Sequence, residues 1–108
     1  MKVELPAVVQ TYVDSSNRHD VKAILSCFSD GAIVQDEAHE YRGSKEVEDW
    51  ITTTIEKYRF QIKPLSVSNA DAETVVVLEV SGTFPGSPIT LDYRFTITGD
   101  KISSLTID

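Results

Sequence analysis

Acids, a histidine and a tyrosine gather in one short stretch, AIVQDEAHEYRG, which runs from Ala32 to Gly43. The stretch begins as an apolar strand, and alternate residues of a strand share a face. Asp36 therefore continues the row of Ala32 and Val34. A carboxylate at this place either lies in water at the end of the strand or faces a pocket. A carboxylate held near apolar walls is what removal of a proton next to a carbonyl group requires.

His39 follows Asp36 in the same stretch, and an imidazole changes its charge near neutral pH. The two side chains could work together as acid and base. The alternative is a solvent-exposed histidine, because loops lie mostly at the surface. Glu37 and Glu40 add acids nearby, but these residues match no metal-ligand spacing. We expect no metal and no cofactor, since the chain also has no phosphate loop or dinucleotide fingerprint.

Length and charge restrict the kind of protein. The 108 residues suffice for a single domain, 1–108, with one core. A net charge of −7 with scattered basic residues argues against a nucleic-acid surface. No leader-like segment and no long apolar run appears, so we expect a cytoplasmic protein that does not bind a membrane. Cys27 is the lone cysteine, which excludes an intrachain disulfide.

Apolar residues spaced three and four apart predict three helices. Asp20 and Ser44 are the expected N-caps of the second and third helices. The second helix is expected to end at Asp30-Gly31, where the strand from Ala32 takes over. The three apolar stripes are Leu5, Val8, Val9, Tyr12 and Val13; then Val21, Ile24, Leu25 and Phe28; then Val47, Trp50, Ile51, Thr54, Ile55 and Tyr58.

The second half of the chain reads as four strands, at about 60–68, 73–84, 88–98 and 101–107. Pro64 suggests an edge or a bulge in the first of them. Short connections make sequential strands antiparallel neighbours. The order of elements predicts an α+β domain with helices on one face of a curved sheet.

This order, together with particular residues, resembles the SnoaL-like branch of the nuclear transport factor 2-like superfamily over essentially the whole chain. The stretch AVVQTYVDSSNRHDVKAILSCFSDGAIVQD is similar to the start of ketosteroid isomerases. Shared features are the tyrosine of the first helix, the Asn-x-x-Asp turn, the Phe-Ser-Asp-Gly-Ala segment and the strand aspartate. The later segments YRG, FPGSP and GDKI are closer to SnoaL-like proteins of unassigned function. The resemblance implies a cone-shaped fold of three helices packed on a curved, mainly antiparallel sheet.

The resemblance also implies roles for single residues. Tyr12 and Asp36 fall on the positions that carry the oxyanion-hole hydroxyl and the general base in ketosteroid isomerases. The third isomerase group is an aspartic acid on a late strand, for which Asp92 is the candidate. Alternation along that strand turns Asp92 outward, near Arg94 on the same face. Asp92 is therefore not expected to be catalytic, and steroid turnover is not expected.

We expect a domain that binds a small apolar ligand, with isomerase- or cyclase-like acid–base chemistry on a carbonyl compound. Asp36 would be the base, Tyr12 the donor and His39 an auxiliary group. The alternative is a non-catalytic dimerisation or interaction module whose cavity is filled by its own side chains, with Tyr12 as a core residue. The expected ligand-binding residues are Trp50, Val34, Phe28, Ile55, Tyr58, Phe60 and Tyr93.

The sheet is expected to have more apolar surface than the helices can cover. The run from Val75 to Leu78 is apolar at consecutive positions, and so on both faces of its strand. Pairing the second face with a symmetry mate would bury it. The sequence therefore predicts a homodimer through the sheet.

Overall fold

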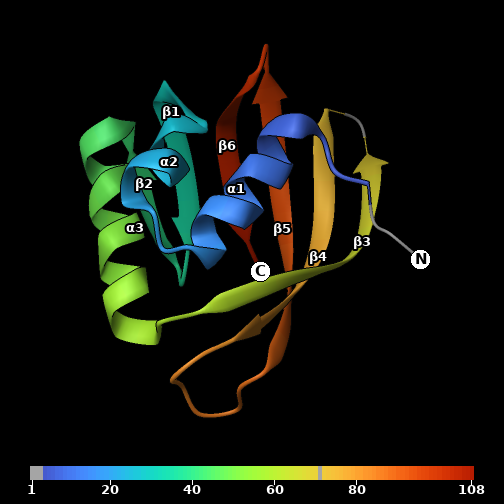
Figure 1. Cartoon of the computed structure of the whole chain (residues 1–108). Coiled ribbons are helices and arrows are strands. Elements are labelled where there is room, and N and C mark those ends of the chain that lie inside the picture. The colour runs from blue at the N-terminus through green and yellow to red at the C-terminus, as the bar shows by residue number, and fades with distance from the viewer. Residues whose placement is uncertain (1–3, 71) are drawn as a thin grey trace.

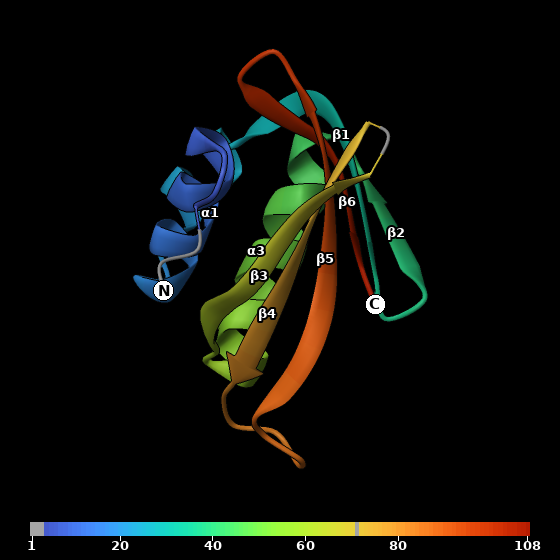
Figure 2. The same cartoon turned by 90° about the vertical axis from the view of Figure 1, so that its right-hand side faces the viewer.

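A computed structural model describes residues 4–70 and 72–108 and shows three helices on one face of a six-stranded sheet (Figures 1 and 2). The α+β class predicted from the sequence is confirmed. The helices are α1 (Ala7–Asn17), α2 (Val21–Ser26) and α3 (Gly43–Tyr58). The strands are β1 (Phe28–Asp36), β2 (His39–Arg42), β3 (Gln61–Ala70), β4 (Glu73–Ser81), β5 (Ile89–Thr98) and β6 (Lys101–Ile107).

The strands lie in the order β2-β1-β6-β5-β4-β3. The predicted meander of the last four strands is present, and each of its neighbouring pairs is antiparallel. The last strand, β6, then lies parallel to β1, the first strand of the chain. A register shift between Pro64 and Ser66 confirms the bulge expected at Pro64. The sheet thus brings the acidic stretch at the end of β1 beside the end of the chain.

The three helices cover different parts of the sheet. The short helices α1 and α2 form a pair; α1 packs against β3 and β6, and α2 against β1. The long helix α3 packs against β1 and β2, and among the described residues it makes no close backbone approach to β4 or β5. In Figure 1, α3 runs past α1 and α2 towards the end of the sheet at which the β4–β5 connection lies. Only α3 therefore reaches that end of the sheet.

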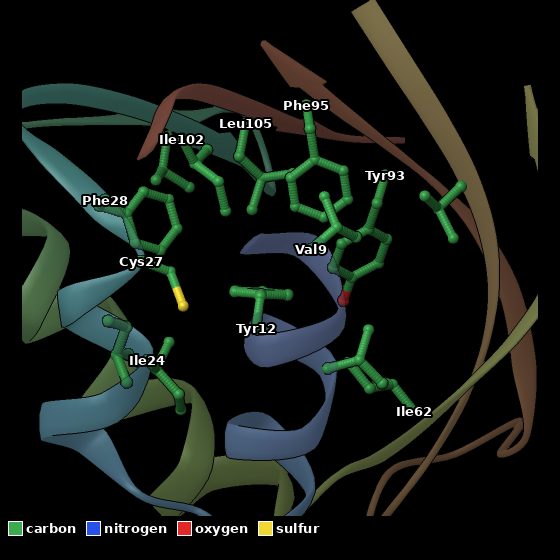
Figure 3. Packing of buried hydrophobic residues seen from close by; sticks show 14 of the residues in the cluster. Val9, Tyr12, Ile24, Cys27, Phe28, Ile62, Tyr93, Phe95, Ile102 and Leu105 are labelled. Atoms are coloured by element: carbon green, nitrogen blue, oxygen red, sulfur yellow. The ribbon is translucent and has the colours of Figure 1, made fainter. Parts of the chain in front are cut away.

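Apolar side chains fill the space between the α1–α2 pair and the sheet (Figure 3). We call this part of the domain the closed end. Phe95 of β5 and Leu105 of β6 are completely buried there. Cys27 is buried in the same cluster. The residues of the closed end are Val9, Val13, Ile24, Cys27, Phe28, Phe95, Ile102 and Leu105.

Two local expectations were wrong and one was confirmed. Helix α2 ends at Ser26, because the carbonyl of Cys27 already accepts a sheet hydrogen bond from the Ile102 N–H, at 2.8 Å. Phe28 consequently belongs to β1 rather than to the helix. Ser44 does not cap α3, since its hydroxyl donates to a backbone carbonyl elsewhere. Asp20 does cap α2, where its carboxylate accepts the Ala23 N–H at 3.2 Å.

The acidic stretch forms a β-hairpin that the sequence did not predict. Strands β1 and β2 are joined by the two-residue turn Glu37-Ala38, with φ of 53° and 64°. Both values are positive, as in the tight turns that match the twist of a hairpin. Glycine and asparagine usually mark such turns, and neither is present here. Asp36 and His39 flank the turn as register partners.

Candidate functional site

A pocket of about 440 Å³ lies between α3 and the inner face of the sheet, at the end that α1 and α2 do not cover. We call this the open end. The volume is within the usual range for small-molecule sites. Exposed side chains from Glu37, Lys57, Pro85 and Ile89 mark its mouth. The lining residues are Tyr12, Asp36, Glu37, Trp50, Thr54, Lys57, Tyr58, Phe60, Val80, Phe84, Pro85, Ile89, Leu91, Tyr93 and Ile107.

Asp36 is the polar centre of this pocket. The side chain is half-buried, and its carboxylate accepts a hydrogen bond from the indole N–H of Trp50 at 3.0 Å. Burial raises the pKa of Asp36; the bond from Trp50 opposes the rise and the neighbouring Glu37 carboxylate adds to it. A carboxylate with a raised pKa is a stronger base than a solvated one.

Two buried tyrosines border the same pocket. Tyr12 of α1 is 2% exposed and Tyr93 of β5 is 6% exposed, and their ring centroids lie 6.4 Å apart. Burial raises the pKa of Tyr12 well above its usual value, and Tyr93 and Asp36 raise it further. Burial and then the Asp36 carboxylate raise the pKa of Tyr93 in the same way. Both phenols therefore keep their protons at neutral pH and can donate them in hydrogen bonds.

Asp36 has no ion-pair partner among the residues that the structure describes. The ion pairs found there are Arg42 with Glu40, and Arg94 with both Asp92 and Asp108. Lys57 is the one basic residue that lines the pocket, and its ammonium lies 5.0 Å from the centre of the Tyr58 ring. The carboxylate is thus held by hydrogen bonds in largely apolar surroundings rather than neutralised by a cation.

The structure brings many of the predicted site residues together. Asp36 and Tyr12 line one pocket, and so do four of the residues expected to bind a ligand, Trp50, Tyr58, Phe60 and Tyr93. Their roles in binding and catalysis stay predictions. Val34, Phe28 and Ile55 are not on the pocket wall. Val34 is fully buried in the core, and the Phe28 ring packs edge-on against Tyr12 in the core cluster, at 5.9 Å.

His39 does not line the 440 Å³ pocket, and its expected role as an auxiliary acid–base group stays a prediction. It is exposed at the start of β2, and its ring centroid is 6.4 Å from that of Tyr41. It is the register partner of Asp36 across the hairpin, and the two residues line a second, neighbouring pocket together. Asp92 faces outward and lies 3.7 Å from Arg94, as alternation along the strand predicted.

Several lining residues were missed by the sequence analysis. They are Glu37, Thr54, Lys57, Val80, Pro85, Ile89, Leu91 and Ile107. Thr54 belongs to the apolar stripe of the third helix, and alternation places Leu91 on the face opposite Asp92. Both could therefore have been predicted as lining residues. Glu37 could not, because simple alternation places it on the opposite face from Asp36. The positive φ of the turn overrides that alternation.

Two general features of the described residues concern metals and membranes. Nowhere in residues 4–70 and 72–108 do three or more histidine, cysteine or acidic side chains come close enough to hold a metal ion. Within the same ranges, each helix is too short or too polar to span a bilayer.

Comparison with known proteins places this geometry in context. The chain is similar to a candidate polyketide cyclase from Sinorhizobium meliloti, with 33% identity, a TM-score of 0.92, and coverage of 96% of this chain and 95% of that one. No curated protein matches the chain.

More distant structures share the fold. The epoxide hydrolase/cyclase-like enzyme SalBIII, which acts in pyran ring formation in salinomycin, has 22% identity, a TM-score of 0.82, and coverage of 94% and 86%. A protein from Catenulispora acidiphila with a ketosteroid isomerase-like fold has 14% identity, a TM-score of 0.83, and coverage of 97% and 86%.

Residues 9–105 match the SnoaL-like domain family. The chain therefore belongs to the SnoaL-like domain family.

Proposed function

We propose that the domain binds a small, largely apolar carbonyl compound in the pocket and removes a proton from the carbon next to its carbonyl group. The observation that carries this proposal is the half-buried Asp36 carboxylate. It faces an apolar pocket that two neutral phenols also border, and it has no basic partner among the described residues. These are the parts that acid–base chemistry next to a carbonyl needs.

In the proposed reaction the Asp36 carboxylate takes the proton, and the electron pair of the C–H bond moves towards the carbonyl oxygen. The Tyr12 hydroxyl donates a hydrogen bond to the enolate oxygen that forms. Tyr93 borders the same space and is placed to give a second hydrogen bond. Asp36 then returns its proton to another carbon, which is an isomerisation. In a cyclisation, the enolate carbon attacks a second carbonyl carbon of the same molecule. The π electrons of that C=O bond move to its oxygen, which takes the proton from Asp36.

The alternative function, a non-catalytic module, calls for a cavity filled by the protein's own side chains. The space between Tyr12, Asp36 and Trp50 is instead part of the open 440 Å³ pocket, which favours ligand binding. The likeness to a candidate polyketide cyclase at 33% identity favours carbonyl chemistry. His39 has no part in the proposal, because it lies outside the pocket.

The proposal is tested with 2-tetralone, a bicyclic ketone whose protons next to the carbonyl group are weakly acidic. Proton NMR in deuterium oxide follows the exchange of these protons. We expect the protein to accelerate exchange above the buffer rate and Asp36→Asn to reduce the acceleration to background. Tyr12→Phe should weaken the acceleration by about 100–1,000-fold, the range of losses for a single oxyanion donor.

Asp92→Asn is the matched control, because Asp92 is an aspartate on the outer face of the sheet. The Asp92→Asn variant should accelerate the exchange of the 2-tetralone protons as much as the unmodified protein does. Exchange at the buffer rate with the unmodified protein, or full acceleration by Asp36→Asn, would contradict the proposed role of Asp36.

We further propose that the domain forms a homodimer through the outer face of the sheet. Val75 and Val77 of β4 stand on that face and are only half-buried. Their register partners on β5 are Arg94 and Asp92, so the valines lie among charged groups. Sedimentation at micromolar concentration should give the mass of two chains, and Val77→Glu should give the mass of one. A single-chain mass for the unmodified protein would rule out the dimer.

A further inference from the structure

We infer that Tyr58 is a specificity-determining residue, because its side chain joins two segments that border the mouth of the pocket and so limits the size of ligand that can enter. The inference rests on the proposed role of the pocket in binding a small molecule. Tyr58 is half-buried at the last position of α3. Its hydroxyl, its ring and its backbone carbonyl each make a separate contact.

The hydroxyl ties the end of α3 to the β1–β2 turn. It donates a hydrogen bond of 2.5 Å to the Glu37 carboxylate, and both residues line the pocket. Hydrogen bonds to a charged acceptor are among the stronger ones in proteins. The bond to Glu37 raises the pKa of Tyr58, so the phenol keeps its proton, and the bond, at neutral pH. One side of the mouth is therefore closed by a side-chain contact that can break and re-form.

The backbone carbonyl of Tyr58 ties α3 to the β4–β5 loop. It accepts hydrogen bonds from the N–H of Thr83, at 2.8 Å, and from the Thr83 hydroxyl, at 3.1 Å. Gly82 makes this approach possible, because a Cβ at that position would lie 2.4 Å from the same carbonyl oxygen. The loop is thus held against the end of α3 by main-chain contacts.

The ring of Tyr58 completes the border. It packs edge-on against Phe84 of the same loop, with 5.8 Å between ring centroids and an angle of 88° between the planes. The Lys57 ammonium lies 5.0 Å from the centre of the ring. Phe84 and Lys57 also line the pocket. The aromatic pair fixes the position of the ring at the mouth while its hydroxyl reaches Glu37.

The contacts differ in how easily a ligand can displace them. The main-chain bonds to Thr83 form part of the folded loop, whereas the Tyr58–Glu37 bond joins two side chains near the surface. A narrow ligand can enter beside the ring. A wide, rigid ligand must break the Tyr58–Glu37 bond and turn the ring aside. Tyr58 therefore discriminates by width, and loss of its side chain should admit wider ligands.

The test uses three fluorescent phenols of increasing width: 2-naphthol, 9-phenanthrol and 1-hydroxypyrene. Stopped-flow fluorescence gives the association rate and titration gives the dissociation constant of each. With the unmodified protein, both association and affinity should fall from 2-naphthol to 1-hydroxypyrene. In Tyr58→Ala, the affinity for 1-hydroxypyrene relative to 2-naphthol should rise about tenfold or more, a change well above the error of such titrations.

Two milder variants separate the hydrogen bond from the ring. Tyr58→Phe keeps the aromatic contact and loses the bond to Glu37, so 1-hydroxypyrene should associate faster while 2-naphthol is little changed. Glu37→Ala should behave in the same way. Tyr41→Phe removes a tyrosine hydroxyl outside the pocket and should leave the size preference unchanged. Circular dichroism verifies that each variant is folded.

The outcomes distinguish this inference from the proposed function. If the unmodified protein and Tyr58→Ala bind the three phenols with the same preference, Tyr58 does not select by size and the inference is wrong, while ligand binding by the pocket stands. If neither protein binds any of the phenols, the inference about Tyr58 is contradicted, whereas the proposed function is decided by the exchange of 2-tetralone protons. Binding of 1-hydroxypyrene by Tyr58→Ala alone supports the inference in its strongest form.

Discussion

The closed and open ends of the domain are built from the same strands and differ in how their inner face is filled. Strand β5 passes through both. Phe95 is fully buried at the closed end, Tyr93 and Leu91 border the pocket two and four residues earlier, and Ile89 is 39% exposed at the mouth. Alternate residues of one strand thus change from core to pocket wall with no change in backbone structure.

Helix α3 shows the same division along its length. Val47, Trp50 and Ile51 are buried, whereas Thr54 and Tyr58, nearer the end of the helix, are only half-buried. Thr54 and Tyr58 line the pocket, and so does Trp50. The difference follows from the short helices, since α1 and α2 cover only the closed end. Apolar burial therefore stabilises one end, and the other keeps space for a ligand at the expense of burial.

The largest difference in stability between the two ends is expected from truncating β5 side chains. Phe95→Ala should lower the free energy of unfolding by about 3–5 kcal/mol, because it leaves a cavity in a packed core. Leu91→Ala should cost about 1–2 kcal/mol, since that side chain lines the pocket and is only half-buried. Urea unfolding measures both. Equal losses would show that the two ends are packed alike.

A glycine substitution should identify the rigid part of the open end. Gly82→Ala places a methyl group 2.4 Å from the Tyr58 carbonyl oxygen, which is backbone and cannot move freely. We expect a loss of about 1–3 kcal/mol, as for other overpacked sites. Gly31→Ala is the matched control, because nothing lies within 4 Å of its added Cβ. If both variants unfold at the same urea concentration, the β4–β5 loop is not held tightly.

Asp36→Asn should remove the part of the pH dependence of the free energy of unfolding that comes from this carboxyl group at the open end. Burial raises the pKa of Asp36 in the folded state, so the unfolded chain releases this proton first as the pH rises. The contribution of Asp36 to the free energy of unfolding therefore falls as the pH rises from about 3.9, the ordinary aspartate value, through the folded pKa.

The Asn variant, which keeps an acceptor for Trp50, should be as stable as the unmodified protein at pH 7 or more stable by up to about 1 kcal/mol. It should also lose the corresponding part of the acid dependence in thermal melts from pH 3 to pH 7. A variant that is clearly less stable at pH 7 would mean that the charged carboxylate stabilises the fold.

Ionisation of the two buried phenols is expected to have the smallest effect on stability at neutral pH. Because burial raises the pKa of Tyr12 and of Tyr93, the folded protein holds these protons above pH 10, where the unfolded chain releases them. Their contribution to stability is present below pH 10 and is lost above it. Absorbance at the phenolate band should show a late phase that becomes smaller in Tyr93→Phe, where Tyr12 alone still contributes to it. Ionisation of all tyrosines near pH 10 in the folded protein would contradict their burial.

Much of the fold follows from local patterns. The helical stripe of α3, the Asp20 cap, the bulge at Pro64 and the outward face of Asp92 could each be derived from residue spacing and side-chain chemistry. These features depend on neighbours along the chain, which the sequence lists directly. Tyr12 and Asp36 could be predicted as a pair because both continue apolar rows that must face the same interior.

Tertiary structure decided the remaining features, since they depend on contacts between distant segments. Phe28 belongs to β1 rather than to α2 because the carbonyl of Cys27 accepts a hydrogen bond from β6. The turn at Glu37-Ala38 has no sequence marker, yet pairing of β1 with β2 imposes it, and it brings Glu37 to the pocket while His39 stays outside. Residue patterns along the chain determined which faces are apolar, and only packing between distant segments decided which of those faces would meet and which would leave room for a ligand.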